Sequence, residues 1–123
     1  MKVDLESFCA EIVGAYDRKI AGLLLGCRRA GHLAVGADAA AEAMSKGAFL
    51  LVVACDAGSV VEKGFVAYAI SESRAVAWKT KVELGTLFGR EEISVVAVTN
   101  EAIAEQIQRA RSRSEACRSR EVR

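Results

Sequence analysis

The stretch AFLLVVAC at residues 48–55 decides the fold class of this chain. It is short, apolar at nearly every position and rich in β-branched residues, a pattern typical of a strand that is buried on both faces of a sheet. Further strands are predicted at 32–35, at 75–78 (AVAW) and at 93–98 (ISVVAV). Because segments with helical spacing separate these strands, we expect an α/β layer fold with helices on both faces of a small sheet.

Helices are expected throughout the remaining sequence, which contains no proline and 22 alanines. Apolar positions at spacings of mostly three and four residues predict one helix over 3–30, or two if Asp17 caps a second start. Shorter helices are predicted at 37–47, 59–72 and 81–89. A last helix begins with EAIAEQIQRA, and Thr99 or Asn100 is expected to cap it. The expected organisation is a helical extension at 1–16, a domain at 17–108 and a tail at 109–123.

Charge is distributed unevenly along the chain. The formal net charge is only +1, but residues 108–123 contain six arginines and two glutamates, a net charge of +4, whereas the other 107 residues carry −3. The sequence RARSRSEACRSR at 109–120 is rich in arginine and serine and offers little to bury. We expect a solvated, mobile tail, with a phosphate-binding arm as the alternative.

Several classes of protein are disfavoured by composition. The apolar run at 48–55 is much shorter than the roughly 20 residues of a membrane-spanning helix, and acidic residues interrupt the N-terminus where a signal peptide would be apolar. The four cysteines form no C-x-x-C motif and the only histidine is His32, which argues against a zinc site. Cys9, Cys27 and Cys55 lie in apolar stretches and are expected to act as small hydrophobic residues in a reducing cytoplasm.

Motifs for catalysis and for nucleotide binding are also missing from the sequence. It contains no G-x-S-x-G, no Cys–His arrangement, no Walker loop and no GxGxxG after a strand. Asp56 follows the long strand, where α/β proteins often place functional carboxylates, but a turn residue that bonds backbone is the preferred interpretation. We therefore expect neither an enzyme nor a bound cofactor or metal ion.

One surface is a candidate for binding anions. Arg28 and Arg29 end the first predicted helix, and Gly36 leads into the next, whose first backbone N–H groups would favour a phosphate. Lys46 lies two turns further along that helix. The alternative is that these cations only compensate the dipoles at helix C-termini.

Three segments, in this order and at these spacings, carry a family resemblance: GLLLGCRRAG, KGAFLLVVACD and ELGTLFG. Over residues 19–107 the chain resembles the kink-turn RNA-binding ribosomal protein superfamily of the "L-seven-Ae" type, and particularly its small bacterial members. The resemblance implies a three-layer α/β/α sandwich around a mixed sheet of about four strands. It also implies a cytoplasmic, ribosome-associated protein that binds a sharply bent RNA loop without catalysis.

The resemblance assigns RNA contacts to two regions. The first is the start of the second helix, and the second is the loop at 90–94, in which Ile93 would lie against the bases. Arg28, Arg29, Lys46 and Arg90 would bind phosphates. At the helix start the residues are Gly36, Ala37, Asp38, Ala39 and Glu42.

The helix start departs from the pattern of the strong binders, which have Asn, Glu and Lys where this chain has Asp38, Ala39 and Glu42. An ionised Asp38 only accepts hydrogen bonds, whereas guanine O6 and N7 require donors. Glu42 repels phosphate.

A protein-interaction module of the same fold that has lost kink-turn specificity is the second hypothesis. It rests on an apolar stripe in the first helix, formed by Leu5, Phe8, Ile12 and Val13. Through residues 3–16 such a stripe would dock a partner, a second copy or an upstream domain. A substrate-holding domain of an RNA-modifying enzyme is a third, minor alternative.

Overall fold

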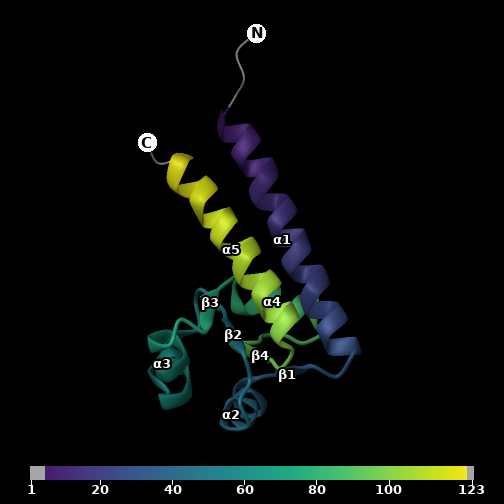
Figure 1. Cartoon of the computed structure of the whole chain (residues 1–123), viewed down its shortest axis with the longest axis vertical. Helices are drawn as coiled ribbons and strands as arrows, with labels where there is room; N and C mark the ends of the chain where they lie inside the picture. Colours follow the sequence, from purple (N-terminus) through teal and green to yellow (C-terminus); the bar gives the residue numbers. More distant parts are fainter. Residues whose placement is uncertain (1–4, 122–123) are drawn as a thin grey trace.

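A computed structural model describes the backbone of residues 5–121 and the side chains of residues 13–60 and 62–114. The helices and strands alternate as the sequence predicts (Figure 1). In chain order they are α1 (Leu5–Arg29), β1 (Leu33–Val35), α2 (Ala37–Ser45), β2 (Leu50–Val53), the 3₁₀ helix η1 (Gly58–Glu62), α3 (Gly64–Ser71), β3 (Ala75–Ala77), α4 (Lys81–Leu87), β4 (Val95–Val98) and α5 (Glu101–Glu121).

The four strands form one mixed sheet in the order β1-β4-β2-β3. β4 runs antiparallel to both of its neighbours, and β2 pairs with β3 in parallel. All residues of the central strands β2 and β4 are buried, because helices cover both faces. In Figure 1, α1, α4 and α5 lie on one side of the sheet, and α2 and α3 lie on the other. The expected α/β/α sandwich around four strands is confirmed.

Helices α1 and α5 pack side by side along much of their length, in opposite directions (Figure 1). Ile20 and Leu24 of α1 and Ile107 of α5 are fully buried in this layer. The far ends of the two helices extend beyond the sheet toward the chain termini, so the domain carries a projecting helix pair.

The structure corrects two expectations for this helix pair. Asp17 caps no second helix, because α1 is continuous; its carboxylate instead accepts hydrogen bonds from Trp78 Nε1 at 3.1 Å and from Lys79 Nζ at 3.4 Å. The tail at 109–123 is not an unstructured arm, since α5 continues to Glu121 and buries both Ala110 and Ser114. The side chains of Leu5, Phe8 and Ile12 lie outside the described residues, so docking through 3–16 stays a prediction.

Two smaller corrections concern the segment at 59–72 and the cysteines. Instead of one helix, the segment forms η1 followed by α3, which starts at Gly64. Cys55 is exposed rather than packed in the core, whereas Cys27 is buried as expected and its Sγ donates to the His32 carbonyl at 3.0 Å. Burial raises the pKa of the Cys27 thiol. Cys9 lies outside the residues whose side chains are described.

Asn100, one of the two residues expected to cap the last helix, performs that role. Its Oδ1 accepts from Ile103 N at 3.0 Å at the start of α5. None of the described helices is long and apolar enough to span a lipid bilayer.

Candidate nucleic-acid interface

The start of α2 presents backbone donors at one end of the sheet. Gly36 joins β1 to α2 with φ of +98°, in the left-handed region that favours glycine. Its N–H donates to the Val95 carbonyl at 3.0 Å and its carbonyl accepts from Ala40 N at 2.9 Å, which fixes the turn. No described side chain caps this helix start. The N–H groups of its first turn are therefore directed toward external acceptors.

Asp38 and Ala39 are exposed in this first turn, and Ala37 is half-buried. The Asp38 carboxylate interacts favourably with the positive end of the helix dipole. It also places a negative charge where an RNA phosphate would approach, so this residue opposes the anion binding that the N–H groups favour.

The turn before β4 lies against the start of α2. A Cβ atom placed on Gly36 would lie 3.7 Å from Arg90 Nη1, so the guanidinium reaches the glycine that opens α2. The backbone N–H of Arg90 donates to the Gly85 carbonyl at 2.7 Å, and Gly89 supplies the positive φ of +72° that the turn needs. Two segments that the resemblance assigned separately to RNA contact thus form one surface.

Gly85 allows this turn to approach α4 closely, a role that the sequence-based reasoning missed. A Cβ at Gly85 would lie only 2.6 Å from the carbonyl oxygens of Arg90 and Glu91. Such a separation is far shorter than van der Waals contact, so any larger residue would displace the turn. The available signal was a glycine inside the predicted helix ELGTLFG, which usually indicates a packing requirement.

Arg28 anchors the beginning of the same turn. Its Nη1 donates to the Phe88 carbonyl at 3.0 Å, and its Cζ lies 5.5 Å from the centre of the Phe88 ring. The sequence predicted a phosphate contact for this side chain, but in the structure it anchors the residues next to Arg90. Arg29 is exposed in the last turn of α1.

Lys46 lies at the opposite end of α2 from Gly36. At a rise of 1.5 Å per residue, the two positions are about 15 Å apart along the helix axis. Lys46 Nζ pairs with Glu42 Oε1 at 3.0 Å, and both side chains are largely exposed. Such a surface pair breaks at little cost, so Lys46 stays accessible to a phosphate, but it is not part of the contact between Gly36 and Arg90.

The Ile93 side chain lies in the core. Its side chain is only 3% exposed and belongs to the core, and its N–H donates to the Lys81 carbonyl at 3.0 Å. This corrects the expectation that Ile93 lies against RNA bases: the apolar side chain is more stable inside the sandwich than on a wet surface.

The carboxylate that follows β2 serves the backbone. Asp56 Oδ1 accepts from the N–H of Lys81 at 2.7 Å and so supports the start of α4, which Thr80 and Glu83 also stabilise through a capping box. Among the described residues, no group of three or more His, Cys, Asp or Glu side chains could hold a metal ion.

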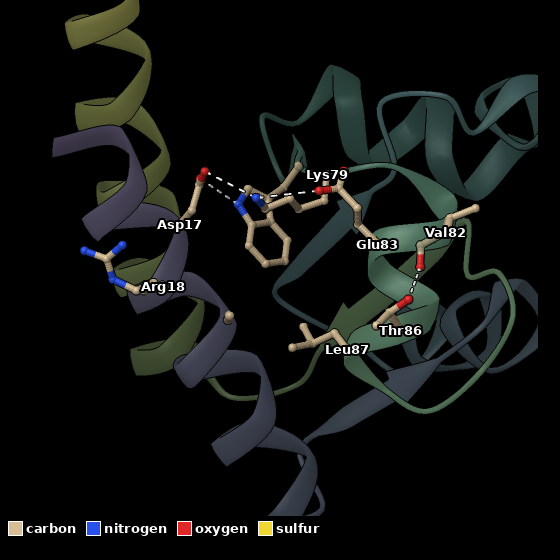
Figure 2. Close-up of a pocket in the computed structure, with 9 residues that line it drawn as sticks. Asp17, Arg18, Lys79, Val82, Glu83, Thr86 and Leu87 are labelled. Carbon is tan, nitrogen blue, oxygen red and sulfur yellow. Dashed lines mark hydrogen bonds and ion pairs between the residues drawn. The ribbon is translucent and has the colours of Figure 1, made fainter. Parts of the chain in front are cut away.

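A mainly apolar groove of about 380 Å³ lies between α1 and α4 (Figure 2). Four of its residues form one network: Asp17 bonds Trp78 and Lys79, and Lys79 Nζ lies 3.8 Å from Glu83 Oε2. The network fastens α1 to α4 across the groove. Figure 2 shows the lining residues Asp17, Arg18, Lys79, Val82, Glu83, Thr86 and Leu87.

Two solved structures have a similar fold. A protein of unknown function from Bacillus halodurans C matches with a TM-score of 0.66 and 23% identity, over 76% of this chain and 97% of the other. The 15.5kD RNA binding protein of Giardia lamblia matches with a TM-score of 0.60 and 17% identity. The match covers 84% of this chain and 90% of the Giardia chain. This chain shares their fold. No family model and no curated protein matches the sequence.

Proposed function

We propose that this chain binds structured RNA, without catalysis, through the start of α2 and the turn that carries Arg90. The observation that carries the proposal is the Arg90 guanidinium beside the uncapped helix start at Gly36. The fold shared with the Giardia RNA-binding protein supports it. The more specific proposal is a cytoplasmic, ribosome-associated bacterial protein that prefers kink-turn RNA.

The surface combines two kinds of donor. Backbone N–H groups at a helix start bind a phosphate or a base acceptor at a fixed position, and a guanidinium offers a planar pair of N–H donors to phosphate or to guanine O6 and N7. Arg28 supports this arrangement as a positioning residue, because it holds the Phe88 carbonyl two residues before Arg90.

The direct test is a titration of the purified chain against a standard kink-turn RNA and against an unbent duplex of equal length, at two salt concentrations. We expect tighter binding of the kink-turn and a fall of log affinity with log salt. Equal binding of the two RNAs would reject the kink-turn proposal. Binding of neither would reject RNA binding and favour the protein-interaction module.

Arg90→Gln is expected to weaken kink-turn binding and to reduce the salt slope by about 0.7–0.9, the change for one phosphate contact. The matched control is Arg74→Gln, which removes an exposed arginine next to the opposite edge strand β3 and should leave binding unchanged. Equal effects of the two variants would contradict a specific role for Arg90.

Arg28→Gln is expected to weaken binding through the displaced turn, and to lower the salt slope by no more than Arg90→Gln does, because it acts through the Arg90 contact. Its effect should largely disappear in the Arg90→Gln background, because both substitutions remove the same interaction with RNA. Additive losses in this double-mutant cycle would mean that Arg28 binds RNA directly.

Asp38→Asn is expected to raise affinity for kink-turn RNA several-fold, because it removes a negative charge and adds an amide donor in the exposed first turn of α2. The same titration measures it. An affinity that does not rise would mean that RNA does not approach this turn.

A further inference from the structure

A second basic surface lies on the helix pair, away from α2. Lys19 of α1 and Arg109 and Arg113 of α5 line one groove of about 370 Å³, together with Tyr16 and Gln106. We refer to these residues as the helix-pair groove. The three cations are exposed, and the packing of α1 on α5 brings them together although they come from opposite ends of the chain.

The charges of the helix-pair groove are not neutralised within the part of the chain that the structure describes. No ion pair there involves Lys19, Arg109 or Arg113, and Glu105 is the only acidic residue in the lining. Arg109 and Arg113 are four residues apart on α5, a spacing at which like charges repel and weaken a helix. Glu105 lies four residues before Arg109 and offsets part of this repulsion, and the positive charge that remains in the groove is suited to an external anion.

Arg111 differs from its two neighbours in the RARSR sequence. Its Nε donates to the Ala77 carbonyl at 2.6 Å, so this side chain covers part of the edge strand β3. At 100° per residue, Arg111 lies on the far side of α5 from Arg109 and Arg113. Because α5 continues as a helix, Arg111 contacts the sheet, whereas Arg109 and Arg113 line the groove.

We propose that the helix-pair groove binds backbone phosphates of the RNA, as a second contact separate from the start of α2. The inference rests on the proposed function and extends its footprint. Two arginines and a lysine match a polyanion, and Gln106 adds a neutral donor. Contacts of this kind are independent of sequence, so the groove strengthens binding to any RNA helix, whereas α2 supplies the preference for a bent one.

The test is the double variant Arg109→Gln with Arg113→Gln, titrated against the same kink-turn RNA and duplex. We expect affinity for both RNAs to fall and the salt slope to decrease by about 0.7–0.9 for each phosphate that the variant no longer binds. The ratio of the two affinities should stay at the wild-type value. The melting temperature should change little, because the substitutions remove the repulsion between Arg109 and Arg113 together with the attraction between Glu105 and Arg109.

The matched control is Lys63→Gln with Arg74→Gln, which removes two exposed cations outside the groove. An unchanged salt slope in the groove variant, or an equal loss in the control, would overturn the inference while the wild-type affinity still supports RNA binding. A wild-type chain that binds neither RNA would overturn both proposals.

Discussion

Gly85→Ala is expected to lower the free energy of unfolding by about 1–3 kcal/mol, although alanine is the better helix former. The added methyl group would lie 2.6 Å from the carbonyl oxygens of Arg90 and Glu91, so the turn before β4 must move. Because that turn carries Arg90, kink-turn binding should weaken at least as much as in Arg90→Gln. Urea unfolding measures the first effect, with the single tryptophan, Trp78, as the fluorescent probe.

The control for Gly85 is Gly22→Ala in α1. Gly22 is also helical, but a Cβ there would meet nothing within 4 Å. This substitution is therefore expected to raise the free energy of unfolding by up to about 1 kcal/mol. Opposite signs for the two variants would establish that the packing of the turn, rather than helix propensity, requires glycine at 85. Equal stabilisation by both would contradict the close approach of the turn to α4.

Leu51→Ala is expected to lower the free energy of unfolding by about 2–5 kcal/mol. Leu51 is fully buried in β2, opposite Ala97 of β4 and Ala75 of β3, and these small neighbours cannot fill the cavity. Since a domain of this size has a stability of about 5–15 kcal/mol, the variant could lose a large part of it. Urea unfolding at neutral pH provides the measurement.

Leu25→Ala is the control for this truncation. Leu25 lies on the outer side of α1 and is 36% exposed, so its loss leaves no closed cavity and should cost much less than the loss of Leu51. A similar cost at both positions would mean that the two side chains are equally buried in solution.

The proposed RNA surface combines regions that the sequence indicated with contacts that it did not. The resemblance pointed to the helix start at Gly36 and to the loop containing Arg90, and the structure brings these two regions together. The expected contact by Ile93 was wrong, because an isoleucine next to a strand contributes more to the core than to a wet surface. The role of Arg28 toward Phe88 could not be deduced from spacing, since the two residues meet only after α1 and α4 pack.

The helical structure of the tail at 109–123 also could not be predicted from local sequence. Its composition, rich in arginine and serine, is typical of a solvated arm, and nothing local indicates that α1 offers a surface on which α5 can continue. Ala110 and Ser114 are small enough to face that neighbouring helix, and both are buried. Helix formation here follows from packing rather than from propensity.

The sequence by itself determined the strands, most of the helices and their order, because the apolar periods of these elements are local and the central strands are apolar on both faces. It also predicted that a helix begins after Gly36, and the backbone N–H groups of the first turn of that helix are donors whatever its side chains are. It did not predict the division of 59–72 into η1 and α3 or the continuation of α5. Only the tertiary structure decided which cations act together. Arg90 lies beside Gly36, Arg28 bonds the Phe88 carbonyl, and Lys19 lines the same groove as Arg109. Each of these arrangements joins distant segments, and local sequence carries no information about such distances.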